Sequence, residues 1–204
     1  MDPIQVQGML EYWDYLGTFV FCVSGAIAGR QHQMDWFGMF IVALVTGTGG
    51  GLLRSIMLGD LPPAFLTNPA YFILAVSAVM VALHGTNSWQ KITRIVSIID
   101  ALGLGIFLVT GMRIAQSYGL AGWAAIAIGV VSATFGGLLR DVLRNEVPLV
   151  LRKEIYATAC IIGGLALLGF DYANFNETVS LLLTSLIVVV IRLVAIHYAI
   201  NLPR

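Results

Sequence analysis

Long apolar runs recur along the whole chain and are separated by short stretches of polar residues, glycine and proline. A run of roughly 17–25 apolar residues can cross the hydrocarbon core of a bilayer as an α-helix. Because backbone groups in lipid must form hydrogen bonds within the protein, each run is read as a helix and not as a strand. The pattern predicts seven spans, at about residues 12–29, 36–58, 69–83, 95–114, 119–143, 155–170 and 178–200.

Composition narrows the class of protein further. Of the 204 residues, 58% are hydrophobic and only 11% are charged, whereas soluble domains carry about 25% charged residues. Mean hydropathy is +0.88 and the formal net charge is zero. These values exclude a disordered chain, a nucleic-acid-binding domain and a secreted disulfide scaffold. They favour an all-α integral membrane protein, for which we expect no nucleic-acid partner.

Basic residues predict the direction of the spans, because cytoplasmic loops are enriched in lysine and arginine. One set of loops is rich in them and the other holds Arg113 and little else. We therefore expect the N-terminus outside and the C-terminus in the cytoplasm. The start MDPIQVQGML lacks the basic region of a signal peptide, so we expect the first apolar segment to remain in the mature protein. The basic set comprises Arg30, Lys91, Arg94, Arg144, Arg152, Lys153 and Arg204.

The chain resembles itself when it is shifted by 86 residues. From residue 14 to residue 83 the alignment needs no gap, and Asp14 meets Asp100. The run GGLLR at residues 50–54 meets the same run at residues 136–140. Such self-similarity indicates an internal repeat.

The predicted repeat divides one membrane domain into three parts. Residues 12–84 form the first three-helix repeat, residues 95–170 the second, and residues 178–200 a seventh helix outside both. Because three is an odd number, the second copy enters the membrane from the opposite side. The sequence therefore predicts a 3+3 inverted repeat, an arrangement typical of transporters, with the pathway at the repeat interface.

The paired glycines in the second and fifth spans are candidate pore positions. Each glycine weakens a helix by about 1 kcal/mol relative to alanine, so the pairs predict a kink or an unwound turn. Freed carbonyls would have to line water and could replace part of a cation's hydration shell. The alternative is that these glycines only allow close helix packing. The candidate pore and kink residues are Thr48, Gly49, Gly50, Gly51, Thr134, Gly136 and Gly137.

Charged residues inside the spans are candidates for the walls of a conduit. Arg54 and Arg140 are costly in a bilayer and should face a cavity or pair with an acid. Asp14 and Asp100 lie at matching depths, so we predict the pairs Asp14–Arg54 and Asp100–Arg140. The alternative is that both arginines extend to the lipid headgroups.

Several other polar positions leave two or more interpretations open. Asp141 replaces the repeat-equivalent Ser55, and would either attract cations at the inner mouth or balance Arg144. The hydroxyls of Thr48 and Thr134 would line the path or bond back to their own helix. Ser24 and Thr110, which are matched by the repeat, have the same two options. Arg192 in the last span has no repeat partner, and would bridge subunits, bind lipid headgroups or extend to the cytoplasmic surface.

Motifs of known enzymes are absent from the sequence. It contains no HExxH, GxSxG or Walker A pattern. Its three histidines do not cluster at metal-ligand spacing. We therefore expect a protein that is not an enzyme and has neither a cofactor nor a fixed metal site.

The seven spans, the 3+3 repeat and the doubled GGLLR motif resemble the trimeric intracellular cation (TRIC) channels. The second motif, GGLLRD at residues 136–141, is similar to that of their bacterial branch. The resemblance implies a homotrimer in a bacterial inner membrane, in contact with lipid, with one pore through each subunit. It implies a passive channel for potassium and, less selectively, sodium. The second and fifth helices would bound the pore, kinked at the glycine pairs, with Arg54 and Arg140 beside the conduit. From their positions in the spans we also expect Asp141, Asp14 and Asp100 on the pore side.

Two alternatives to a channel stay open at the level of sequence. Bacterial members of this family have also been labelled glycine transporters, and an inverted repeat fits a secondary transporter of a small zwitterion equally well. A membrane scaffold that transports nothing would use its glycines for packing alone.

Overall fold

The computed structural model describes residues 3–84, 89–152 and 155–198, with side chains from residue 8 in the first helix and from residue 94 in the fifth. Lys153, Arg204, the Lys91 side chain and the predicted end of the last span at residue 200 lie outside this description. The described backbone forms α-helices and no strand, which confirms the all-α fold class. The elements are α1 (Pro3–Gln31), α2 (Trp36–Leu58), α3 (Ala64–Thr67), α4 (Ala70–Leu83), α5 (Trp89–Ser117), α6 (Gly122–Leu143), α7 (Leu149–Arg152), α8 (Ala157–Tyr172) and α9 (Glu177–His197).

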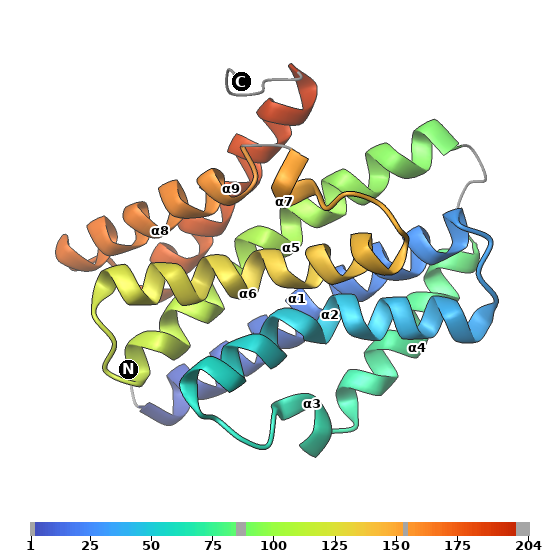
Figure 1. Ribbon diagram of the computed structural model, residues 1–204. Helices are drawn as coiled ribbons and strands as arrows, with labels where there is room; N and C mark the ends of the chain where they lie inside the picture. The colour runs from blue at the N-terminus through green and yellow to red at the C-terminus, as the bar shows by residue number, and fades with distance from the viewer. Residues whose placement is uncertain (1–2, 85–88, 153–154, 199–204) are drawn as a thin grey trace.

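Seven long helices lie where the apolar pattern predicts seven spans (Figure 1). Within the described residues, four segments are long and apolar enough to cross a membrane: α2, residues 94–117 of α5, α6 and α9. The helices α4 and α8 are apolar but shorter. The short helices α3 and α7 were not predicted; each follows a proline turn at an equivalent place in its repeat, after Pro63 and Pro148.

Local sequence signals explain where individual helices begin and end. The Asp35 carboxylate caps α2 by accepting a hydrogen bond from the Gly38 amide at 2.7 Å. The helix stops at Gly59, which has a positive φ of 71° that suits glycine. Before α4, the Asn68 side chain accepts a hydrogen bond from the Ala70 amide at 2.9 Å.

The four helices α1, α2, α5 and α6 form the centre of the molecule. Contacts are most extensive between α1 and α2, α5 and α6, α1 and α5, and α2 and α6. On one side α4 packs against α1 and α2, and on the other α8 packs against α5 and α6 (Figure 1). The last helix, α9, packs against α5 and α8 and therefore touches the second half of the chain.

Glycines allow α2 and α6 to cross at very short range. A Cβ at Gly50 would lie 2.0 Å from the Ser132 carbonyl oxygen, and one at Gly136 would lie 2.1 Å from the Thr46 carbonyl oxygen. Ser132 is the repeat equivalent of Thr46, so the two contacts are reciprocal. Both helices are continuous through the glycines. The helices are therefore not unwound at the glycines, whereas a kink there stays a prediction, and close packing explains Gly50 and Gly136.

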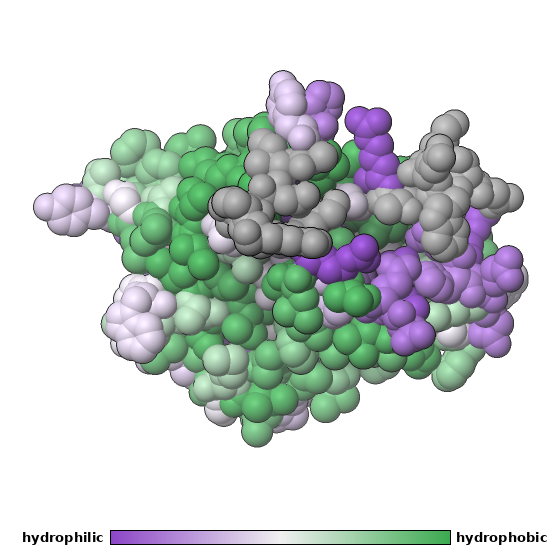
Figure 2. Space-filling model, turned by 45° about the horizontal axis from the view of Figure 1, so that its top comes forward, coloured by the Kyte–Doolittle hydropathy of each residue, from purple (hydrophilic) through white to green (hydrophobic). Residues whose placement is uncertain are grey.

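Large apolar side chains are exposed on the outer helices. They include Phe72 and Ile73 on α4, Leu165 on α8 and Leu186 on α9. Figure 2 shows apolar side chains over most of one face, with hydrophilic residues gathered toward one edge. An apolar surface of this extent fits contact with lipid or with other membrane-embedded chains.

Candidate functional site

A buried ion pair joins α1 to α2 in the first half of the chain. Arg54 Nη2 donates to Asp14 Oδ1 at 3.1 Å. The second carboxylate oxygen of Asp14 accepts a hydrogen bond from the Tyr71 hydroxyl on α4 at 2.8 Å. These three residues, the first triad, connect three helices, and Arg54 is 6% exposed.

The second half of the chain repeats this arrangement. Arg140 Nη1 of α6 donates to Asp100 Oδ1 of α5 at 2.6 Å. The Tyr156 hydroxyl, directly before α8, donates to Asp100 Oδ2 at 2.5 Å. Asp100 and Arg140 are both fully buried. We call these three residues the second triad.

Both predicted Asp–Arg pairs are confirmed by these contacts, so the arginines do not extend to headgroups. The tyrosines were missed by the sequence analysis. Tyr71 and Tyr156 are 85 residues apart, whereas the gap-free alignment uses a shift of 86 and pairs Tyr156 with Ala70. A one-residue gap before α4 would have aligned them. The equivalence of the two triads therefore extends beyond the identities that revealed the repeat.

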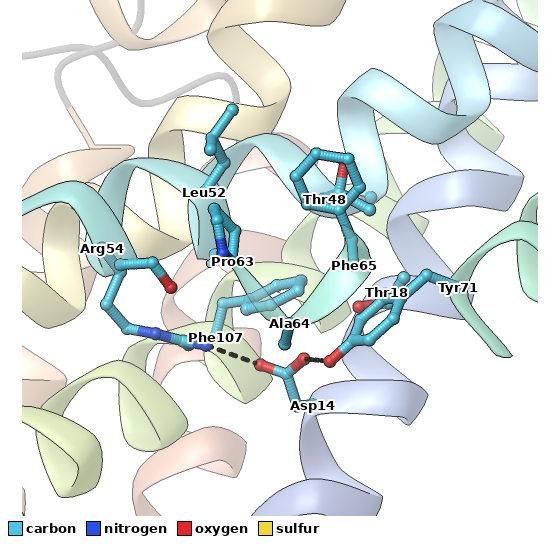
Figure 3. A pocket seen from close by; sticks show the side chains of 13 residues that line it. Asp14, Thr18, Thr48, Leu52, Arg54, Pro63, Ala64, Phe65, Tyr71 and Phe107 are labelled. Carbon is cyan, nitrogen blue, oxygen red and sulfur yellow. Dashed lines mark hydrogen bonds and ion pairs between the residues drawn. The ribbon is translucent and has the colours of Figure 1, made fainter. Parts of the chain in front are cut away.

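The surroundings of the two triads differ. A pocket of about 270 Å³, including its open mouth, adjoins the first triad and is walled on one side by α3 (Figure 3). Water in such a pocket can hydrate Arg54 and Asp14. The lining residues are Asp14, Thr18, Gly47, Thr48, Gly51, Leu52, Arg54, Ser55, Pro63, Ala64, Phe65, Tyr71 and Phe107.

Polar atoms without a partner lie at this pocket. Among the described residues, Arg54 Nη1 and Thr18 Oγ1 have no hydrogen-bond partner, although both are buried. Groups of this kind are rarely left unsatisfied unless water or a ligand supplies the missing bond. The first triad therefore has unused hydrogen-bonding capacity directed at a space that can admit water.

Additional contacts surround Arg140 in the second triad. Its Nη1 also donates to Ser24 Oγ on α1 at 2.7 Å, and its Nε donates to Asp141 Oδ1 at 2.9 Å. Asp141 Oδ2 accepts from the Leu149 amide at the start of α7, at 2.9 Å. Arg140 thus joins both halves of the chain and is held by two carboxylates.

Asp141 is therefore buried and bonded in this structure, not open at a mouth. It is 2% exposed, and its main partner is Arg140. Arg144 Nη1 lies 3.7 Å from Asp141 and Arg144 Nη2 lies 2.7 Å from Glu146. Of the two interpretations, charge balance is favoured, although Arg140 is the principal group balanced. Burial lowers the pKa of Arg144, which lies beyond the end of α6.

The matched hydroxyls mostly bond within their own helices. Thr48 donates to the Leu44 carbonyl at 2.7 Å, and Thr134 donates to the Val130 carbonyl at 2.8 Å. Thr48 also lines the pocket. Thr110 bonds back to the Ile106 carbonyl at 3.0 Å, whereas its repeat equivalent Ser24 accepts from Arg140.

Glycines beside the triads have different amounts of space. A Cβ at Gly51 would have only Arg54 Nη2 nearby, at 3.6 Å. A Cβ at Gly137 would lie 2.8 Å from the Tyr156 hydroxyl and 3.4 Å from Asp100 Oδ1. Gly49 instead faces Leu139 of α6, which a Cβ would approach to 2.8 Å. Of the glycines predicted to line a pore, Gly51 is the one that borders the pocket.

Arg192 of α9 occupies an unexpected place. It is 1% exposed, and its Nη1 donates to the Ile155 carbonyl at 2.6 Å. Its guanidinium carbon lies 4.7 Å from the ring centroid of Tyr156. The expected roles in bridging subunits, binding headgroups or reaching the cytoplasmic surface are therefore wrong, because the side chain is bound inside its own subunit.

Comparison with known proteins agrees with this architecture. The sequence model of the family described as Glycine transporter matches residues 11–86 and residues 97–172, two segments whose first residues lie 86 positions apart. The UPF0126 inner membrane protein YadS of Escherichia coli K12 is 34% identical over 96% of both chains. The structure of the TRIC orthologue from Rhodobacter sphaeroides has a TM-score of 0.87 at 33% identity, covering 94% of this chain and 99% of that chain. A prokaryotic TRIC channel in 0.5 M KCl gives 0.88 at 33% identity, covering 96% and 100%.

The fold and the buried charge pairs thus define an all-helical membrane protein whose structural neighbours are channels and not enzymes. The chain belongs to the bacterial branch of the TRIC channel family, whose sequence model is described as Glycine transporter.

Proposed function

We propose that the protein is a passive channel for monovalent cations, which conducts potassium and, less selectively, sodium. It assembles as a homotrimer in the bacterial inner membrane, with its N-terminus outside and its C-terminus in the cytoplasm. One conduit runs through each subunit between the two inverted repeats, bounded by α2 and α6. The likeness to solved TRIC cation channels supports the class of activity.

The observation that carries the proposal is the pair of matched Asp–Arg–Tyr triads around the crossing of α2 and α6. Charges buried at these depths are expensive and typically mark an ion pathway. In the described conformation Arg54 occupies the pocket of the first triad, and Arg140 fills the sealed space of the second. This conformation is a closed state, and conduction requires both arginines to release their aspartates.

The Asp14 carboxylate has a role in both the closed and the open state of this gate. When Arg54 leaves Asp14, the carboxylate is free to face a passing potassium ion, together with the hydroxyl oxygens of Thr18 and Thr48 on the pocket wall. Oxygen groups of this kind replace part of the hydration shell of a cation. The same carboxylate therefore holds the gate when it is closed and attracts the ion when it is open.

The decisive test is recording from the purified full-length protein in planar bilayers under a potassium gradient. Discrete currents that reverse near the potassium potential are expected. Gly51→Leu, which fills the pocket, lowers the single-channel conductance, whereas Gly169→Leu serves as the control because a Cβ there meets no atom within 4 Å. No current from correctly assembled protein, or equal conductance in both variants, contradicts the proposal.

The two alternatives give different results in matched experiments. A zwitterion transporter shows saturable counterflow of labelled glycine in proteoliposomes, and does so without channel currents. A scaffold excludes water from its interior. Thr134 lies outside the described pocket. Thr134→Cys in a background without Cys22 and Cys160 therefore reacts with a small charged thiol reagent if a conduit runs between α2 and α6, and does not react in a scaffold.

A further inference from the structure

The seventh helix bears a buried charge that touches the second triad alone. Arg192 lies on α9, which packs against α5 and α8, the helices next to Asp100 and Tyr156. Its guanidinium stacks over the Tyr156 ring at 4.7 Å, and Nη1 binds the Ile155 carbonyl at 2.6 Å. Arg192 Nε has no partner among the described residues. A buried cation with so few hydrogen bonds is costly, and such charges are typically functional.

The ring of Tyr156 is therefore held from two directions. Arg192 contacts the face of the ring, and Asp100 Oδ2 accepts a hydrogen bond from the Tyr156 hydroxyl at 2.5 Å. Ile155 and Tyr156 form a turn before α8 begins at Ala157. Because no regular helix ladder fixes this turn, the side-chain contacts of Tyr156 determine where its hydroxyl points.

In the first triad these contacts have no equivalent. Tyr71 lies within α4 and packs edge-on against another tyrosine, Tyr15, with ring centroids 5.5 Å apart. No arginine in the described part of the chain is stacked on that ring, and α9 has no repeat partner beside α4. The charge on α9 thus acts on one of two otherwise matched tyrosines.

We infer that Arg192 is a positioning residue that keeps the second triad closed by fixing Tyr156 against Asp100. With the ring fixed, Asp100 presents its other oxygen to Arg140, and the arginine stays in place. Movement of α9 relative to α8 withdraws this support, so α9 is the element through which changes outside the conduit reach the gate. This inference rests on the proposed channel function.

The principal variant is Arg192→Gln, which keeps a donor for the Ile155 carbonyl but removes the charge over Tyr156. It should fold, since neutralising a buried charge relieves desolvation. In planar bilayers its open probability rises about tenfold, within the usual range of coupling between sites. Single-channel conductance and reversal potential stay at wild-type values. Arg192→Lys, which restores the cation, returns the open probability toward wild type.

Two further variants separate positioning from general loosening of α9. Tyr156→Phe keeps the ring but lacks the hydroxyl, and its combination with Arg192→Gln should have no greater effect than the stronger single change. Ser185→Ala is the matched control, because Ser185 bonds α9 to the Gly105 carbonyl at 3.1 Å, away from Tyr156. Its open probability stays at the wild-type value.

A second readout does not depend on conduction. Cys160 is fully buried and follows Tyr156 by four residues in the chain. In a Cys22→Ala background, a membrane-permeant maleimide labels Cys160 faster in Arg192→Gln than in Arg192→Lys or Ser185→Ala. If the wild type conducts but Arg192→Gln has the same open probability as the wild type, the inference is wrong. It is also wrong if the effects of Arg192→Gln and Tyr156→Phe on open probability multiply in the double variant. If no variant conducts, the channel proposal fails. Equal labelling rates of Cys160 in Arg192→Gln, Arg192→Lys and Ser185→Ala would overturn the role of Arg192 independently of conduction.

Discussion

The two triads contain the same three side-chain types joined by the same bonds, yet one borders an open pocket and the other is sealed. Each triad arginine has one buried nitrogen without a partner among the described residues, Arg54 Nη1 and Arg140 Nη2. The pocket walled by α3 adjoins Arg54 and Asp14. Around Arg140, Ser24 and Asp141 fill the equivalent space. Both halves of the chain contain the ion pair, whereas the residues around it differ and decide whether water can reach it.

The largest expected effect comes from removing one carboxylate charge in each triad. Asp100→Asn leaves Arg140 fully buried beside a single remaining acid, and breaking a buried pair costs about 3–5 kcal/mol of stability. Asp14→Asn costs less than this, because Arg54 borders a pocket in which water can hydrate it. Thermal unfolding in detergent measures both. Equal losses would mean that the two triads are equally accessible to water.

A medium effect is expected from adding one methyl group beside each triad. Gly137→Ala places a Cβ against the Tyr156 hydroxyl, and overpacking of this kind costs about 1–3 kcal/mol. Gly51→Ala has space and gains about 1 kcal/mol of helix propensity, so its melting temperature equals or exceeds that of the wild type. Gly169→Ala, with no atom near its Cβ, controls for propensity. Destabilisation by Gly51→Ala would show that the pocket is closed in solution.

The smallest effect is expected from matched hydroxyl positions. Ser24→Ala removes one of the acceptors of Arg140 and costs about 1 kcal/mol. Thr110→Ala removes a bond to a carbonyl of its own helix, which such residues make at little benefit to stability. Its unfolding temperature therefore remains close to wild type. If Thr110→Ala were the more damaging change, the contact between α1 and Arg140 would not be the one that seals the second triad.

The pattern of apolar residues predicted where the long helices lie, but not where each of them begins and ends. Apolar runs placed all seven long helices, because a span must bury its backbone and present apolar side chains outward. The same pattern missed α3 and α7, because four residues are too few to show a helical period. The alignment of the halves missed the tyrosines, since a single-residue gap before α4 hides Tyr71 and Tyr156 from a gap-free comparison.

What the sequence determined by itself was the fold class and the two Asp–Arg pairs, because a charge in a membrane span is costly and an opposite charge at the same depth lowers that cost. Only the tertiary structure decided the role of the glycines. Gly50 and Gly136 face the opposing backbone, whereas Gly51 and Gly137 face the triads, and a helix pattern does not reveal which neighbour a missing side chain admits. The placement of Arg192 on Tyr156 was likewise beyond the sequence, because it depends on how α9 packs against α5 and α8.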